Sequence, residues 1–349
     1  MRLHRSLTTA VGLAAVGALA LSACASDPST EAGTTEATAA TGGATDEFPV
    51  TITHALGETV IEAAPERVAT WGWGSTEAAL AVGVTPVAVA EQSWTVGEGA
   101  LLPWVEQEYD DLGVDHPAVL TDAEGGATVP YEEFVEADPD LILAPYSGIT
   151  AEQYEVLSDI APVVAYPDTP WTTPWDEVIT TTAEALGRSD AGEQVLADVD
   201  SYIGDLADEH PEIEGKTFAA IVDSPSEGLV YVYTPADPRV GILEGLGVIS
   251  APSVTELDTS DGGFFYTLSY EELDKLESDF LVAYTYTEEE AATFGEGEEL
   301  QAIPAVAAGD VVKVVGNVAV SSVSPPTALS YDWADGVPAI VDQLAEIYG

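Results

Sequence analysis

The sequence predicts an α/β protein in which two lobes, each with a mainly parallel sheet, are joined by one long α-helix. Three observations predict this fold. Short apolar runs alternate with amphipathic stretches from Phe48 onward, one long amphipathic segment lies near the middle of the chain, and a 14-residue pattern occurs once in each half. Such alternation of strands and helices is typical of parallel sheets covered by helices. At about 150 residues per domain, a chain of 349 residues is long enough for two lobes.

The first 23 residues have the pattern of a lipoprotein signal peptide. Arg2 and Arg5 precede an apolar stretch from Leu7 to Leu21 that contains no acidic residue. A transmembrane helix is the alternative, but this stretch is shorter than the ~20 apolar residues that span a bilayer. It leads into Leu-Ser-Ala-Cys, ending at Cys24, which resembles the bacterial lipobox, in which the cysteine is lipidated. Cys24 is the only cysteine, so a structural disulfide is excluded.

The mature chain is strongly acidic. Removing residues 1–23 takes away two of the eight basic residues and none of the 62 acidic ones, so the net charge of −54 becomes −56. This charge argues against binding to nucleic acids or anionic lipid surfaces, because both require clustered Lys and Arg. Residues 24–46 contain few large apolar side chains, which predicts a flexible tether. We therefore expect an exported protein held at the extracytoplasmic side of the cell membrane by its lipid anchor alone.

The N-terminal lobe is expected over residues 47–188. Apolar runs predict strands at 67–71, 86–90, 141–144 and 162–165, and helical patterns cover 75–82, 150–160 and 174–186. Ser75 is placed as the N-cap of the first helix, and Thr150 with Gln153 as a capping box for the second. Thr173 is placed as the cap of the third, with Pro174 at its first position.

The linking helix is expected over residues 189–211. Asp190 and Glu193 favour a helix start after Gly187, and apolar residues then recur at helical spacing up to His210. At 1.5 Å per residue this helix is roughly 30 Å long. The C-terminal lobe is expected over 212–349, with strands at 218–222, 229–233, 280–284 and 311–315 and helices near 242–246 and 333–347.

Residues 131–144 and 270–283 form an internal repeat that aligns without a gap. Each copy begins with Tyr-Glu-Glu and reads as a helix whose first turn carries two carboxylates, then a turn containing Asp, then a buried strand. Chance similarity is the alternative in so acidic a chain. The shared Tyr, the Asp before each strand and the apolar runs in register favour duplication.

The sequence contains none of the common catalytic motifs. There is no Walker-type phosphate loop, no dinucleotide-binding glycine pattern, no His-Glu-x-x-His and no Gly-x-Ser-x-Gly elbow. His54, His116 and His210 are the histidines of the mature chain, and they lie in distant segments. We therefore expect no enzymatic activity, no metal site and no cofactor. A surface hydrolase or chelatase built on the same lobes is the alternative.

Aromatic side chains follow the ends of several predicted strands. Ligands of open α/β sheets bind just outside the carboxyl ends of the strands, so two facing lobes would enclose an aromatic cleft. The alternative is that the rings fill the lobe cores. The candidate ligand-binding aromatics are Trp73, Trp94, Tyr146, Trp171, Tyr233, Phe265 and Tyr284.

Several stretches together resemble the substrate-binding proteins of ABC importers for ferric siderophores, whose lobes are joined by a rigid helix. They lie at 48–57, 65–68, 77–87, 138–142 (Asp-Pro-Asp-Leu-Ile), 146–150 and 324–330 (Ser-Pro-Pro-Thr-Ala-Leu-Ser), and the similarity covers 47–349. The resemblance implies the helical-backbone type of periplasmic-binding-protein fold. It also implies capture of a ferric siderophore and delivery to an ABC permease driven by a cytoplasmic ATPase. Cobalamin and haem are the alternative cargoes. We expect a monomer with limited hinge motion.

The resemblance also implies two permease-docking residues. In that family each half presents a glutamate to arginines of the permease, in the segments that match the repeat, which gives Glu132 and Glu271 here. A carboxylate in the first turn of a helix is stabilised by the helix dipole. Glu272 is expected to form a capping box with Ser269, which leaves Glu271 free. The alternative is that both residues are merely solvated helix starts.

Arg239 is the predicted ligand-binding cation. It lies in Asp-Pro-Arg-Val-Gly, which resembles the family's Arg-Phe-Gly motif with Val240 in place of Phe, and in the family this Arg faces anionic oxygens of the ligand. The alternative is a salt bridge to Asp237 or another acid. With so few cations, a neutral or cationic ferric hydroxamate is expected rather than an anionic tris-catecholate. No protein ligand to iron is expected, because the chelator fills its coordination sphere.

Overall fold

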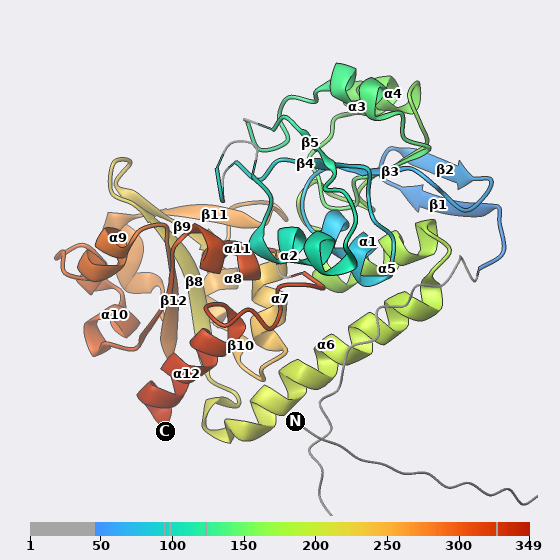
Figure 1. Ribbon diagram of the computed structural model, residues 1–349. Helices are drawn as coiled ribbons and strands as arrows, with labels where there is room; N and C mark the ends of the chain where they lie inside the picture. The colour runs from blue at the N-terminus through green and yellow to red at the C-terminus, as the bar shows by residue number, and fades with distance from the viewer. Residues whose placement is uncertain (1–45, 94, 98–99, 123, 326) are drawn as a thin grey trace, which may run out of the picture. The chain divides into compact units, whose positions relative to one another are not determined.

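The computed structural model describes residues 46–349, apart from 94, 98–99, 123 and 326 (Figure 1). The predicted signal peptide and Cys24 lie outside the described residues, as does all but the last residue of the predicted tether. Within the described part, no helix combines the length and the apolar character needed to cross a membrane.

The first half of the described chain holds a five-stranded sheet in the order β5-β4-β3-β6-β7, with every pair parallel. Its strands are β3 (Val68–Thr70), β4 (Ala88–Ala90), β5 (Ala118–Leu120), β6 (Leu141–Leu143) and β7 (Val163–Val164). Its helices are α1 (Ser75–Ala81), α2 (Pro103–Leu112), α3 (Tyr131–Ala137), α4 (Ala151–Ser158) and α5 (Trp175–Ala185). An antiparallel hairpin of β1 (Val50–His54) and β2 (Gly57–Ile61) comes before this sheet.

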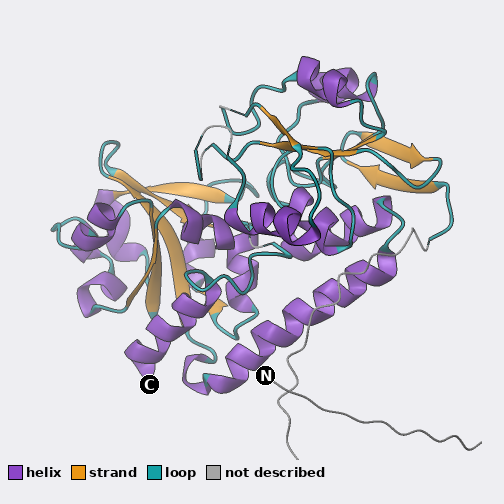
Figure 2. Cartoon of the chain, in the orientation of Figure 1, coloured by secondary structure: helices purple, strands orange, loops and turns teal. Residues whose placement is uncertain are grey.

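The second half holds a six-stranded mixed sheet in the order β11-β9-β8-β12-β13, with β10 also paired to β8 (Figure 2). The strands are β8 (Thr217–Ser224), β9 (Leu229–Tyr233), β10 (Ile249–Ser250), β11 (Phe265–Ser269), β12 (Phe280–Thr285) and β13 (Val311–Val315). The helices are α7 (Pro238–Glu244), α8 (Pro252–Glu256), α9 (Glu288–Thr293), α10 (Pro304–Ala308), α11 (Asn317–Val323) and α12 (Val337–Tyr348), with 3₁₀ turns η1 (Pro211–Ile213), η2 (Tyr270–Lys275) and η3 (Leu300–Ala302). Only the β8–β9 and β9–β11 pairs are antiparallel. The predicted α/β class with mainly parallel pairing is confirmed.

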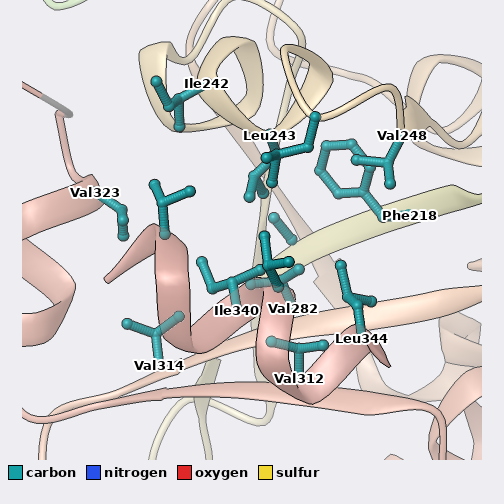
Figure 3. Packing of buried hydrophobic residues seen from close by; sticks show 14 of the residues in the cluster. Phe218, Ile242, Leu243, Val248, Val282, Val312, Val314, Val323, Ile340 and Leu344 are labelled. Carbon is teal, nitrogen blue, oxygen red and sulfur yellow. The ribbon is translucent and has the colours of Figure 1, made fainter. Parts of the chain in front are cut away.

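Both faces of the second sheet are buried, because alternate side chains of its strands join different clusters. Phe218 and Val282 belong to a cluster with Leu243 of α7 and with Ile340 and Leu344 of α12, in which Phe218 lies beside Leu243 and Val282 beside Ile340 (Figure 3). Ala219, Ile221 and Leu281 point to the opposite face and pack against α8 and α10. Strands buried on both faces read as continuous apolar runs, which explains why the sequence marks β8 and β12 so clearly.

The long helix α6 (Ser189–Glu209) lies between the two sheets in the chain and packs against α5 and η1. Its 21 residues correspond to about 31 Å. Asp190 and Glu193 do not cap it. Instead the carboxylate of Asp46 accepts hydrogen bonds from the backbone N–H (3.1 Å) and hydroxyl (2.6 Å) of Ser189. A partner 143 residues away thus supplies the acceptor that the local sequence lacks.

The predicted helix caps have mixed outcomes. The capping box is confirmed, because Gln153 N–H donates to the Thr150 hydroxyl (3.2 Å) and Thr150 N–H to the Gln153 side chain (2.8 Å). The cap at Ser75 is wrong, since Gly74 occupies that position with a left-handed φ of 77°. Thr173 is wrong as well: its hydroxyl donates to the Pro145 carbonyl at 2.6 Å, and the helix begins after Pro174.

The two copies of the repeat make the same contacts to the neighbouring strand. Asp140 accepts a hydrogen bond from Arg67 N–H at 2.9 Å, and its own N–H donates to the Arg67 carbonyl at 2.8 Å. Asp279 accepts from Thr217 N–H at 2.8 Å, and its N–H donates to the Thr217 carbonyl at 2.9 Å. Each Asp therefore fixes the start of the strand parallel to its own, β3 or β8, which supports duplication.

An apolar contact joins the two halves away from α6. Leu80, Leu102 and Trp104 of the first half form one cluster. Val318, Leu329 and Trp333 of the second half pack against this cluster, and the Trp104 and Trp333 rings meet edge to face at 5.3 Å. A smaller cluster of Ala78, Ile179 and Ala328 also joins them, so apolar packing holds the halves together in addition to α6.

Substitution by alanine at two glycines of α6 is expected to change the free energy of unfolding in opposite directions. A Cβ at Gly192 would lie 2.5 Å from the Ala183 Cβ of α5, whereas nothing lies within 4 Å of one at Gly204. We expect Gly192→Ala to lower the free energy of unfolding by roughly 1–3 kcal/mol through overpacking. Gly204→Ala should raise it by about 0.5–1 kcal/mol through helix propensity. Urea unfolding of both variants tests this, and equal shifts would contradict the α5–α6 packing.

Candidate functional site

Three predicted aromatic residues of the first half meet at the carboxyl ends of adjacent strands. Trp73 follows β3, Tyr146 follows β6 and Trp171 follows β7. Their ring centres are 6.4 Å (Trp73–Tyr146), 5.7 Å (Trp73–Trp171) and 5.6 Å (Tyr146–Trp171) apart. Tyr146 is buried, and both tryptophans are half-buried. Tilted and edge-to-face contacts of this kind stabilise aromatic pairs beyond the area they bury.

A glycine allows this group to form. Gly72 has φ of 85°, and a Cβ on it would lie 2.2 Å from the Tyr146 carbonyl oxygen. With glycine in that position, the backbone N–H of Trp73 donates to the same carbonyl at 3.1 Å. Gly72 therefore sets how close the ends of β3 and β6 come to each other.

The predicted residues of the second half gather around a buried ion pair. Arg239 Nε donates to Asp237 Oδ1 at 2.7 Å, and the two residues are 6% and 1% exposed. The guanidinium carbon lies 3.7 Å from the ring centre of Tyr233 and 5.5 Å from that of Tyr284. Asp237 also caps α7, where it accepts from Arg239 N–H at 2.9 Å. The alternative stated for Arg239, a salt bridge to Asp237, is thus formed.

The ion pair and the first-half aromatics lie close enough to interact electrostatically. Burial raises the pKa of the Tyr146 hydroxyl, the charge of Asp237 raises it further, and Arg239 lowers it. Burial also raises the pKa of Asp237, against the lowering effect of Arg239. The Asp237 Oδ2 and the Tyr284 hydroxyl are buried without a hydrogen-bond partner in the described structure. Polar groups without partners in such a setting are costly, so they are candidates for ligand contacts.

A cavity of about 340 Å³ is lined from both halves. Trp73 and Thr95 belong to the first half, and the rest of the lining comes from the second: Tyr286, Asn317, Val320, Ser321 and Ser324. The volume falls at the small end of the range for ligand pockets. Mixed aromatic and hydroxyl walls can hold an organic ligand without bond-making. This cavity is therefore the candidate site, and Trp73 is the predicted residue that lines it.

The other residues that line this cavity were not among the ligand-binding residues predicted from the sequence. Tyr286 lies just beyond β12, in the position that marked the other candidates, and it is 44% exposed. Ser324 begins one of the stretches that carried the family resemblance. The contribution of Asn317 and Ser321 depends on how α11 is placed after β13, which no local pattern specifies.

Two predicted aromatics lie elsewhere or are not described. Phe265 lies on the edge strand β11, where its ring contacts Tyr231 (5.3 Å) and Phe264 (4.8 Å). Trp94 lies outside the described residues. Both assignments to the ligand site stay predictions.

Glu132 and Glu271 are exposed, and no hydrogen bond or ion pair joins either to another described residue. Each is followed by a glutamate with partners. Glu133 accepts from Thr121 N–H (2.7 Å) and hydroxyl (2.8 Å). Glu272 does not form the predicted capping box, because Ser269 makes no cap hydrogen bond. Its carboxylate accepts from the Ser269 hydroxyl at 3.3 Å and pairs with Lys275 at 2.8 Å, and Glu271 is still left free.

A buried carboxylate lies beside the cavity. Glu77 is 3% exposed and accepts a hydrogen bond from Trp104 Nε1 at 3.1 Å. Together with Trp73, Thr95 and Ser324 it lines a narrow crevice next to the larger cavity. Burial raises the pKa of Glu77, and the indole hydrogen bond only partly offsets this.

The described residues contain no group of three or more His, Cys, Asp or Glu placed to hold a metal ion. His54 pairs with the Thr59 hydroxyl at 3.0 Å and His116 with Asp110 at 3.0 Å. His210 lies 3.0 Å from Glu212. Each described histidine thus has a local partner.

Comparison with known proteins identifies the class. A family model described as periplasmic binding protein matches residues 68–315, and the chain belongs to this family. The predicted resemblance is thereby confirmed, together with the two-lobed fold that its structural relatives share.

Particular relatives carry names that describe siderophore or solute binding. The probable siderophore-binding lipoprotein YfiY of Bacillus subtilis (strain 168) is 30% identical over 246 residues, which are 69% of this chain and 70% of that protein. PiaA of Streptococcus pneumoniae TIGR4, solved in complex with ferrichrome, is 30% identical with a TM-score of 0.77, and the match covers 85% of this chain and 98% of PiaA. A periplasmic solute binding protein from Mycobacterium smegmatis str. MC2 155 is 26% identical with a TM-score of 0.69, covering 86% and 99% of the two chains.

The raised pKa of Glu77 predicts a pH-dependent stability. The native state keeps the proton of this carboxyl to a higher pH than the unfolded chain does, so the contribution of Glu77 is fully present below about pH 4.3 and declines above it. We expect Glu77→Gln to gain stability relative to the wild type as the pH rises from about 5 to 7. Urea unfolding at several pH values measures this difference.

Glu106→Gln is the matched control, because Glu106 is an exposed carboxylate in the first turn of α2. This variant controls for the loss of one negative charge without the removal of a buried group. Parallel stability curves for Glu77→Gln and the wild type would show that burial of Glu77 has no energetic consequence.

Proposed function

We propose that the protein is an extracytoplasmic solute-binding protein that captures a ferric siderophore in the cavity between its halves and delivers it to an ABC permease. The observation that carries this proposal is the cavity lined by Trp73 and Tyr286 from opposite halves. The ferrichrome complex of PiaA and the description of YfiY support a siderophore as the ligand. The protein contributes shape and aromatic surface, and the chelator holds the iron.

The buried ion pair favours a hydroxamate over a catecholate. Arg239 is the cation nearest the aromatic group, and Asp237 at 2.7 Å neutralises most of its charge. A tris-catecholate carrying several negative charges would find no net positive field in a chain of this acidity. A neutral or cationic ferric hydroxamate needs no positive field, because aromatic faces and hydroxyls suffice to hold it.

Glu132 and Glu271 supply the proposed contacts to the permease. One lies at the start of each repeat copy, both are exposed, and the glutamate that follows each is already engaged. Exposed ion pairs contribute only ~0.2–1 kcal/mol, so two of them would orient the protein more than hold it. Contact through both halves also lets the permease sense their relative position.

Membrane attachment through Cys24 completes the proposal. The relative YfiY is described as a lipoprotein. We expect the wild type in the membrane fraction and Cys24→Ala in the soluble fraction after export. Recovery of both proteins in the membrane fraction would exclude the lipid anchor as the sole attachment.

The ligand assignment predicts tight binding of ferrichrome and weaker binding of a ferric tris-catecholate. Trp73→Ala should weaken ferrichrome binding by about tenfold, because one aromatic wall of the cavity is lost. Tyr154→Ala, which removes a ring on α4 that contacts His54, should leave the affinity unchanged. Isothermal titration calorimetry measures the affinity of the wild type and of both variants for ferrichrome, and the affinity of the wild type for the tris-catecholate. A tighter catecholate complex would overturn the hydroxamate preference, and the visible spectrum of the purified protein would reveal haem or cobalamin.

The docking assignment predicts a defect in transport without a defect in binding. In cells lacking the wild-type protein, Glu132→Gln combined with Glu271→Gln should lower uptake of radiolabelled ferric iron from ferrichrome, while the affinity of the purified variant stays unchanged. Glu136→Gln, an exposed neighbour on α3, is the control and should transport normally. Wild-type uptake by the double variant would remove these glutamates from the permease interface.

A further inference from the structure

A second cavity, of about 480 Å³, lies within the second half at the carboxyl ends of β8 and β12. Asp223 near the end of β8, Tyr286 beyond β12 and Phe294 after α9 are among its lining residues. Tyr286 also lines the cavity between the halves, so the two cavities share a wall. A ligand in the first cavity is therefore next to the second. The ends of parallel strands are the usual place for ligand groups in such sheets.

The lining of this cavity is negative. Three carboxylates belong to it, Asp223, Glu290 and Glu299, and its described lining contains no Lys, Arg or His. One oxygen of the Glu290 carboxylate, Oε2, accepts a hydrogen bond from Tyr286 N–H at 2.8 Å. Asp223 accepts a hydrogen bond from the Tyr270 hydroxyl at 2.6 Å and one from the Ser224 backbone, and neither donor carries a charge. No hydrogen bond or ion pair joins the Glu299 carboxylate to another described residue.

The charge in the cavity is not balanced by its surroundings. Burial raises the pKa of Asp223 and the charge of Glu299 raises it further, against the hydrogen bond from Tyr270. Lys313 lies 5.8 Å from the ring centre of Phe294, but its ammonium donates to the Ala291 carbonyl and the residue is outside the lining. A cation entering the cavity would relieve this repulsion.

The chemistry of the lining selects an organic cation over a metal ion. No three or more His, Cys, Asp or Glu of the described residues are placed to coordinate a metal ion. The carboxylates of this cavity, which include Asp223 and Glu299, are therefore not arranged as a metal site. The rings of Tyr270, Tyr286 and Phe294 supply surfaces suited to an ammonium group and its methylenes. Tyr284 also lines the cavity, and its buried hydroxyl has no hydrogen-bond partner in the described structure.

We propose that this cavity binds an organic monocation, the ammonium-bearing arm of a chelate whose iron centre occupies the cavity between the halves. The claim that the cation is an arm of a bound chelate rests on the proposed function, whereas the claim that the cavity binds an organic cation does not. The arm would pass Tyr286, and its ammonium would lie between the Asp223 and Glu299 carboxylates. Among ferric hydroxamates, those that carry a free amine would gain this additional contact, whereas ferrichrome, which has no free amine, would occupy only the cavity between the halves.

The first test uses n-pentylammonium alone, so it is independent of iron chelates. Saturation-transfer NMR with the purified wild-type protein should detect its binding, and n-pentanol of similar shape should bind about tenfold more weakly. Asp223→Asn combined with Glu299→Gln should weaken n-pentylammonium binding by a similar factor. Glu298→Gln, an exposed neighbour outside the lining, should not. If n-pentylammonium fails to bind, or binds equally to the double variant, the cation site is overturned.

The second test uses a chelate and its uncharged counterpart. Ferrioxamine B carries a terminal ammonium group, and N-acetylation removes that charge while leaving the iron centre intact. The wild type should bind the charged form about five to ten times more tightly, and the double variant should bind both forms equally. Equal binding by the wild type would overturn the assignment of the arm. If n-pentylammonium binds but neither ferrioxamine form nor ferrichrome does, the proposed function fails while the cation site stands.

Discussion

The apolar contact between the halves is the constraint on which the site depends. Leu102 and Trp104 of the first half pack with Leu329 and Trp333 of the second, on a chain already joined through α6. A helix alone would allow the halves to swing, but the contact of the buried Trp104 with the partly buried Trp333 resists separation, because separation would expose apolar area to water. The ends of the two sheets are thus held around one cavity.

The buried ion pair shows how so acidic a chain keeps a cation at its centre. Charges removed from water are tolerated only when they are paired and hydrogen-bonded, and Arg239 meets this condition with Asp237 and the Tyr233 ring. The pairing makes the region polar without making it positive. The Tyr284 hydroxyl, which is buried and has no hydrogen-bond partner in the described structure, adds a second polar group beside the ion pair.

Local signals allowed correct prediction where the stabilising partner lies nearby in the sequence. The capping box of Thr150 and the buried strands β8 and β12 follow from short patterns, and the Asp before the strand in each repeat copy, Asp140 or Asp279, makes the same backbone contact. Prediction failed where the partner comes from far away. The cap of α6 is Asp46, and Thr173 bonds to Pro145 rather than to its own helix. The family resemblance led to Arg239, but no pattern shows which predicted aromatics line the cavity.

Trp171 has a φ of 62°, which is uncommon for a side chain of its size, and its ring fills space left by two glycines. A Cβ at Gly148 would lie 2.2 Å from the indole nitrogen, and one at Gly126 would lie 3.1 Å from the ring. The indole ring is therefore held in one rotamer by its close contact with the backbone at these glycines. During evolution or engineering, exchange of Trp171 for a smaller residue would leave space beside Gly126 and Gly148, so replacement at this position is coupled to replacement at the two glycines.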